Sequence, residues 1–162
     1  MTAVDAVHSP ESYYSAPVRG ASACAAQHWE RFVSIPNVEW LHLRAEKLRL
    51  ERLAALGENW DARGSAAPSQ IAIQKVSRDL LRQLYQAVST EANGWTTPHI
   101  TASEAGEIVL EWWHRERKIT LYISDTRIEY IKVGGLDIDN EMEAGSIFSE
   151  QDFLSVWTWL HS

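Results

Sequence analysis

The chain has 162 residues, a typical length for one domain. Its apolar fraction of 45% and charged fraction of 23% lie close to the averages of globular proteins, so wholly disordered, collagen-like and coiled-coil classes are excluded. No apolar run approaches the roughly 20 residues that span a bilayer, and the N-terminus lacks the basic and apolar segments of a secretory signal. The single cysteine, Cys24, fits a reducing compartment. We therefore expect a cytoplasmic protein with no membrane partner.

The net charge of −7 is concentrated at one end of the sequence. Residues 136–162 contain six Asp and Glu residues and no Lys or Arg, whereas acidic and basic residues nearly balance in the rest of the chain. Such a segment repels phosphate backbones and is attracted to basic surfaces. It predicts a protein partner with a basic surface and no direct binding of nucleic acid, although solvated carboxylates that keep a small protein dispersed give the same pattern.

Two helices are predicted in the first half of the chain. Residues 1–28 lack periodicity and are expected to form a flexible tail, followed by a single domain over residues 29–162. From Trp40 to Gly57 one apolar stripe runs beside another, which predicts a helix with one broad buried face and with Glu46 among the solvated charges. The two stripes are Leu41, Ala45, Leu48 and Ala55, and Leu43, Leu50, Leu53 and Ala54. The second helix follows steps of three and four through Ile73, Val76, Leu80, Leu84 and Val88.

The middle of the chain changes from helical to alternating periodicity. Strands are predicted over residues 99–101, 108–113, 118–123 and 127–130. The short polar connections between the later strands suit antiparallel hairpins. Alternation over residues 136–139 predicts a short fifth strand at an acidic sheet edge.

A third helix is predicted at the end of the sequence. Ser149 and Asp152 match a capping box, and a buried stripe follows at Phe153, Val156, Trp157 and Leu160. Together the elements predict an α+β fold: two helices, then a four- or five-stranded antiparallel sheet, then a C-terminal helix. We expect the helices to cover one face of the sheet.

The most distinctive local string is Gly-Glu-Asn-Trp-Asp-Ala-Arg-Gly, over residues 57–64 between the first two helices. The Asp61 carboxylate can accept hydrogen bonds from nearby amides, Gly64 can adopt a positive φ, and Trp60 can anchor the loop to the core. We therefore expect these three residues to have a structural role, because a single acid is not a catalytic site.

Residues 59–69 resemble the Gly-Trp-Asp-Gly-type motif of a group of small uncharacterised bacterial proteins. In that group the motif precedes a helix and, further on, a strand similar to residues 108–114 of this chain. The resemblance extends over residues 48–133 and departs from the motif at Asn59 and Ala62, where the group has glycine. It implies a bacterial origin and a compact fold, and it carries over no known activity.

Two histidines and two acids are the candidates for chemistry. Glu111 and His114 are three residues apart on a predicted strand, so they point to opposite faces unless a bulge joins them. His99 can approach either one in the folded chain. With Asp61, these residues support the alternative hypothesis of a small hydrolase or ribonuclease-like enzyme. No catalytic set is predicted, because the phosphate-loop, zinc-protease and serine-hydrolase motifs are missing.

We expect neither a metal nor a cofactor. Acidic residues alternate like calcium ligands at Asp137, Asp139, Glu141 and Glu143. An EF-hand loop, however, requires glycine at its sixth position, where this chain has Met142.

Eight tryptophans are many for this length. The adjacent Trp112 and Trp113 must face opposite sides of a strand, and Trp159 falls outside the buried stripe of the last helix. If they are exposed, Trp113 and Trp159 suit interface anchors.

The favoured hypothesis is therefore a non-enzymatic interaction protein, such as an inhibitor, antitoxin, immunity or anti-defence protein. Its binding residues would be Trp113, Trp159, Asp137, Asp139, Glu141 and Glu143. A structural subunit that buries its tryptophans in a homodimer is a further alternative.

Overall fold

A computed structural model describes residues 43–135 and 141–162. Several predicted features lie outside these residues: the tail over residues 1–28 with Cys24, the start of the first helix at Trp40, and the strand over residues 136–139 with Asp137 and Asp139.

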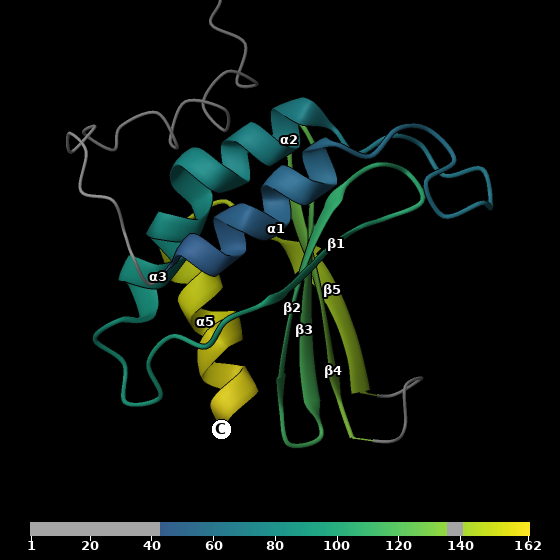
Figure 1. Ribbon diagram of the computed structural model, residues 1–162. Coiled ribbons are helices and arrows are strands. Elements are labelled where there is room, and N and C mark those ends of the chain that lie inside the picture. Colours follow the sequence, from purple (N-terminus) through teal and green to yellow (C-terminus); the bar gives the residue numbers. More distant parts are fainter. Residues whose placement is uncertain (1–42, 136–140) are drawn as a thin grey trace, which may run out of the picture.

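The centre of the fold is a five-stranded antiparallel meander, with the strands paired in chain order β1-β2-β3-β4-β5. The strands are β1 (His99–Ala102), β2 (Ile108–His114), β3 (Arg117–Ile123), β4 (Ile128–Gly134) and β5 (Met142–Ser146). Figure 1 shows the helices gathered on one side of this sheet. The predicted α+β class, with two helical segments, an antiparallel sheet and a C-terminal helix, is confirmed.

The helical layer contains three segments. Its elements are α1 (Arg44–Ala54), the continuous run of α2 (Gln70–Lys75), η3 (Val76–Leu80, a π-helical turn) and α3 (Leu81–Val88), and α5 (Glu150–His161). Ser69 begins the second segment, because its side chain accepts a hydrogen bond from the Ala72 amide. At the start of α5, Ser149 and Asp152 form the predicted capping box.

The core lies between the helical layer and one face of the sheet. The predicted stripes of the second and last helices are buried, from Ile73 to Val88 and from Phe153 to Leu160. On the strands, alternate residues meet them: Ile108, Leu110, Trp112, Ile119, Leu121, Ile123 and Ile128. The Trp112 indole donates a hydrogen bond to the Thr96 carbonyl oxygen (2.8 Å), so the core contains this large ring with its polar atom paired.

The prediction for the first helix is partly wrong. Leu43 and Leu50 are buried, but Leu48, from the other predicted stripe, is 46% exposed. Glu46, predicted on the solvated side, is fully buried, and neither carboxylate oxygen has a hydrogen-bond partner among the described residues. Positions 43, 46 and 50 are three and four residues apart and share one helix face, so the spacing of Glu46 places it in the core despite its charge.

The strand β5 was not predicted from the sequence, and the strand predicted over residues 136–139 lies outside the described residues. β5 has the sequence Met-Glu-Ala-Gly-Ser, with no apolar alternation. It nevertheless pairs with β4 in an unbroken register from Glu129 opposite Ser146 to Val133 opposite Met142. Pairing with a neighbouring strand decides its conformation here, since strand propensity depends strongly on context.

None of the helices in the described parts of the chain has the length and apolar character needed to cross a membrane.

Candidate functional site

The face of the sheet that points away from the helices is the first candidate surface, and we call it the open face. Its side chains alternate along each strand with those of the core. The strand register arranges them in rows across the sheet. The row nearest the β2–β3 turn is Trp113, Lys118, Val133 and Met142, and the next is His99, Glu111, Thr120, Ile131 and Ala144.

Trp113 is the most prominent side chain of the open face. It is 54% exposed, whereas the adjacent Trp112 points into the core. Its ring does not stand alone, because the Lys118 Nζ atom lies 5.1 Å from the ring centroid. The ring centroid of His99 lies 6.0 Å from that of Trp113. The tryptophan therefore presents an exposed apolar surface in an orientation that its neighbours fix.

Glu111 connects the polar residues beside Trp113. Its carboxylate forms an ion pair with Lys118, accepts a hydrogen bond from the Thr120 hydroxyl (3.3 Å), and lies 3.4 Å from Nδ1 of His99. The sheet register explains this cluster, since His99, Glu111 and Thr120 lie directly opposite one another on β1, β2 and β3. The structure thus brings two of the four candidate catalytic residues together.

The other two candidates lie elsewhere. His114 is on the helix side of the sheet, where its ring centroid is 4.6 Å from that of His161. Both ring nitrogens of His161 are buried, and neither has a hydrogen-bond partner within residues 43–135 and 141–162. Burial lowers the pKa of His161, and the neighbouring His114 lowers it further. Asp61 belongs to the loop before the second helical segment, so Asp61, His99, Glu111 and His114 do not form one site.

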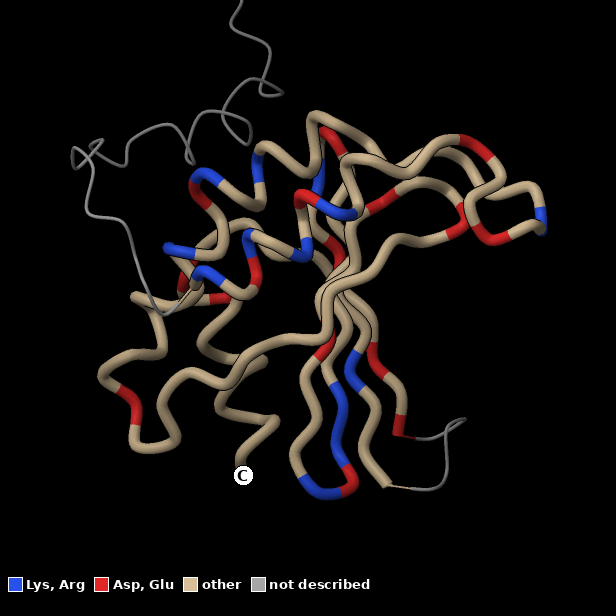
Figure 2. Tube along the Cα trace, viewed as in Figure 1, with Lys and Arg blue, Asp and Glu red and all other residues tan. Residues whose placement is uncertain are grey.

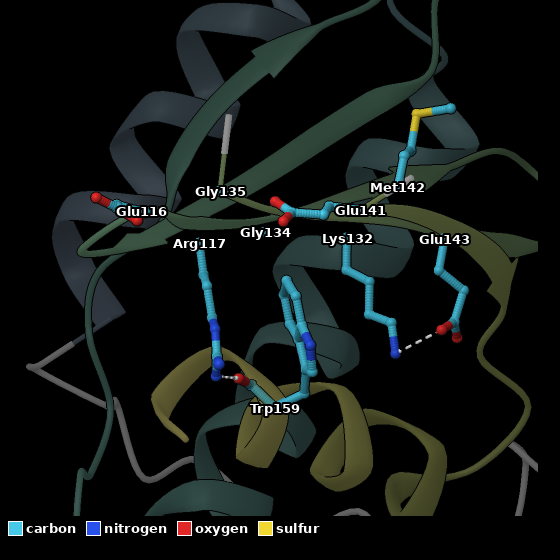
Figure 3. Close-up of a pocket in the computed structure, with 9 residues that line it drawn as sticks. All are labelled: Glu116, Arg117, Lys132, Gly134, Gly135, Glu141, Met142, Glu143 and Trp159. Atoms are coloured by element: carbon cyan, nitrogen blue, oxygen red, sulfur yellow. Dashed lines mark hydrogen bonds and ion pairs between the residues drawn. The ribbon is translucent and has the colours of Figure 1, made fainter. Parts of the chain in front are cut away.

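A pocket of about 610 Å³ opens at the end of the sheet, on the helix side, and Trp159 forms part of its wall. Figure 3 shows the Trp159 ring between the side chains of Arg117 and Lys132. The Arg117 guanidinium carbon and the Lys132 Nζ atom each lie 5.3 Å from the ring centroid. A Cβ atom on Gly134 would be only 3.2 Å from the ring. Trp159 therefore packs α5 against β3 and β4, on the opposite side of the sheet from Trp113.

One acidic residue of the pocket, Glu143, is paired with a lysine and a tyrosine of the neighbouring strand β4. Lys132 Nζ lies 2.9 Å from the Glu143 carboxylate and the Tyr130 hydroxyl donates to it (3.1 Å). The lysine contact lowers the pKa of Glu143, while burial and, next, the bond to Glu143 raise the pKa of Tyr130. Glu141 forms no ion pair within residues 43–135 and 141–162 and points its carboxylate toward Gly135. Of the four predicted acidic binding residues, Glu141 is thus the one described residue with a free charge.

The loop from Asn59 to Ser69 is held by its own polar groups. Asp61 accepts hydrogen bonds from the Arg63 amide (2.9 Å) and the Ser65 hydroxyl (2.7 Å), and the Ser65 bond, first among the causes, lowers the pKa of Asp61. Asn59 accepts a bond from the Gly64 amide (2.7 Å). Trp60 is half-buried, and its buried indole nitrogen has no hydrogen-bond partner in the described part of the chain. These hydrogen bonds give the Asp61 side chain a structural role within the loop.

The same loop is joined to the β1–β2 turn. The Ala66 amide donates to the Glu104 carbonyl oxygen (2.9 Å), and the Ser69 amide donates to that of Gly106 (2.8 Å). A Cβ on Gly106 would lie 2.5 Å from the Ala67 carbonyl oxygen, so this close approach requires glycine.

No family model, curated protein or solved structure matches this chain. Across the described residues, no three His, Cys, Asp or Glu side chains gather into a group that could hold a metal ion.

Proposed function

We propose that this protein is a protein-binding module whose partner docks on the open face, with Trp113 as the anchor. The observation that carries the proposal is the 54% exposure of a tryptophan whose ring is oriented by Lys118 and His99. Tryptophan is enriched among the residues that dominate binding energy, and a fixed ring loses little conformational freedom on docking.

The charges of the open face support a protein partner more than a nucleic acid. Glu111 is paired with Lys118, and Glu129 is paired with Arg127 (3.1 Å). A nucleic-acid surface needs unpaired Lys and Arg residues that neutralise phosphates. Glu141, beside the Met142 end of the open face, carries a negative charge that forms no ion pair within the described residues. A partner with an apolar contact and a basic rim fits this arrangement.

The roles that suit such a module are those of an inhibitor, antitoxin, immunity or anti-defence protein, with a basic protein as the target. The resemblance to the small bacterial proteins with the Gly-Trp-Asp-Gly-type motif remains a prediction and assigns no target.

The test compares two variants that remove large exposed side chains. Trp113→Ala removes the anchor, and Phe148→Ala removes a 61% exposed ring in the connection between β5 and α5, outside the strands that form the open face. The full chain and both variants are used as bait in lysate of the native host, with quantitative mass spectrometry. The proposal expects a partner that is retained by the wild type and Phe148→Ala and lost with Trp113→Ala. A retained protein set that is the same for all three chains would contradict it.

One contact favours a second candidate, a small hydrolase or ribonuclease-like enzyme. Glu111 lies 3.4 Å from Nδ1 of His99, which leaves the other ring nitrogen toward solvent, as in a general base oriented by a carboxylate. Cleavage of single-stranded RNA that is lost in His99→Ala and kept in His114→Ala would support this function. His114 is the control because it lies on the other side of the sheet. No cleavage by the wild type, or equal cleavage by His99→Ala, would reject it.

A further inference from the structure

The two edges of the sheet differ in how they are covered. At the β1 edge, α1 lies close by, and Arg49 of α1 donates a hydrogen bond to the Pro98 carbonyl oxygen directly before β1 (3.0 Å). At the other edge, β5 pairs with β4 on one side, and no other strand of the described chain pairs with its outer side. The outer side of β5 is therefore the accessible edge of the sheet (Figure 1).

The register identifies the backbone groups at this edge. The Ile147 amide donates to the carbonyl oxygen of Ile128, directly opposite it in the β4–β5 register (2.9 Å). Hydrogen-bonded and non-hydrogen-bonded pairs alternate in an antiparallel ladder. Glu143 and Gly145 therefore direct their amides and carbonyls toward β4. The corresponding groups of Met142, Ala144 and Ser146 point outward.

The edge is held in position by side-chain contacts, and it carries no proline, lysine or bulge. A Cβ on Gly145 would lie 2.7 Å from the Tyr130 ring, so this ring lies directly on the strand, and the Tyr130 hydroxyl bonds to Glu143. The Lys132 Nζ atom forms an ion pair with the same Glu143 carboxylate. Natural edge strands are commonly blocked by proline, lysine or a bulge. β5 contains neither residue and pairs without interruption from Met142 to Ser146.

The two sides of β5 have different chemistry. Met142, which is exposed, and Ala144 belong to the open face beside Val133 and Ile131. Glu143 lies on the opposite side of the strand, and Glu141 precedes it. No Lys or Arg occurs anywhere in residues 136–162, and Figure 2 shows acidic residues at this end of β5. Side chains on neighbouring strands interact with those directly opposite, so an added strand would place apolar residues beside Met142 and Ala144 and a basic one beside Glu143.

We propose that the outer edge of β5 binds an extended segment of a protein partner as a sixth antiparallel strand, in which apolar residues alternate with Lys or Arg. This inference deepens the proposed function and rests on it, because the added strand enlarges the open face next to the row of Trp113. A second copy of β5 does not fit, since it would bring its own Glu141 and Glu143 to the same edge and repel.

The test uses the synthetic peptide acetyl-Lys-Val-Lys-Val-Lys-Val-Lys-amide as the probe and the full ¹⁵N-labelled chain. Binding is expected to slow hydrogen exchange at the Met142, Ala144 and Ser146 amides.

Ala144→Pro removes an outward amide and keeps the bonds to β4. It should weaken binding at least about tenfold, the scale of a lost backbone hydrogen bond with a steric clash. Ala144→Ser keeps the amide and should bind within about twofold of the wild type. A peptide with Glu in place of Lys should bind at least about tenfold more weakly.

A peptide with N-methylated valines tests the same bonds on the unmodified chain, so the conclusion does not depend on the folding of Ala144→Pro. It is expected to bind at least about tenfold more weakly than the parent peptide. Four results would overturn the inference: no binding of the parent peptide, equal binding of the N-methylated peptide, protection of the Ala144 amide in the free chain, or dimerisation that Ala144→Pro abolishes.

Different results would contradict docking on the open face and strand addition at β5. If Trp113→Ala loses the native partner and Ala144→Pro keeps it, docking on the open face stands and strand addition is wrong. If no partner depends on Trp113 but the peptide binds β5 as described, the edge site stands and the anchor is wrong.

Discussion

Arg117 of β3 and Trp159 of α5 are joined twice. The guanidinium lies 5.3 Å from the centroid of the indole ring, and Nη1 donates to the Trp159 carbonyl oxygen (2.5 Å) at the end of the helix. The same nitrogen donates to the carbonyl oxygen of Ser162 (2.6 Å). A cation that binds the last carbonyls of a helix satisfies groups that have no partner within the helix and interacts favourably with its dipole.

Arg117→Ala is therefore expected to lower the free energy of unfolding by about 1.5–3 kcal/mol, the range for hydrogen bonds to a charged group. Urea denaturation followed by far-ultraviolet circular dichroism measures this change. Arg78→Ala, an exposed arginine of η3, is the matched control and should change the value by no more than about 0.5 kcal/mol. Equal stability of Arg117→Ala and the wild type would show that the contact contributes nothing.

The loop before the second helical segment allows a stabilising substitution. Ala62 has a φ of 61°, in the left-handed region that costs an L-residue roughly 1–2 kcal/mol. Ala62→Gly should remove most of this strain and raise the free energy of unfolding by about 1 kcal/mol, less the extra entropy of glycine in the unfolded chain. Ala66→Gly, at a neighbouring exposed position without a positive φ, should not stabilise the protein. Urea midpoints decide the result, and a loss of stability in Ala62→Gly would count against strain at this position.

The sequence predicts the parts of the fold that depend on local pattern. The stripe from Ile73 to Val88 and the capping box of Ser149 each follow from the spacing of residues within one element. The position of β5 does not follow from the spacing of its own residues, because Met142 to Ser146 have no apolar alternation and form a strand by pairing with β4. The burial of Glu46 is not predicted for a related reason. What packs on a helix face decides its burial, and the charge of one residue does not.

The candidate site is predictable in part. Alternation places Trp113 on the face opposite Trp112, and the structure has the two residues in that arrangement. The contact between His99 and Glu111 depends on the register of β1 and β2. A shift of one residue would turn His99 to the other face. The sequence between the strands predicted over residues 99–101 and 108–113 does not determine the register to that precision. Trp159 is likewise outside the helix stripe, but its contacts with Arg117 and Lys132 come from tertiary packing.

His161 gives the stability a pH dependence whose sign follows from its environment. Burial and His114 lower its pKa in the folded state, whereas the unfolded chain keeps the ordinary value of 6.5. Below that value the unfolded chain takes up a proton that the folded chain resists. The stability contribution of neutral His161 is therefore complete above about pH 6.5 and is lost as the pH falls toward and through its lowered pKa.

His161→Gln should lose less stability than the wild type between about pH 7.5 and about pH 5. Urea midpoints of both chains at the two pH values give the comparison, and the difference between the chains isolates His161 from the other titrating groups. Parallel losses in the two chains would show that His161 does not titrate differently on folding.

The adjacent tryptophans should respond very differently to truncation. Trp112 is 1% exposed and Trp112→Ala should cost about 3–5 kcal/mol, the range for aromatic residues removed from a core. Trp113→Ala should cost about 1 kcal/mol or less, because it loses mainly the contacts with Lys118 and His99. Thermal unfolding of the two variants checks the difference. A cost for Trp113→Ala close to that of Trp112→Ala would mean that Trp113 belongs to the folded core.

The affinity of the captured partner for the wild type and for Trp113→Ala, measured by titration calorimetry, tests the central claim most directly. Docking on the open face with Trp113 as anchor predicts at least about a thirtyfold loss of affinity, the scale of a dominant interface residue. Phe148→Ala should bind as the wild type does. Equal affinity of the wild type and Trp113→Ala for the partner would contradict the claim.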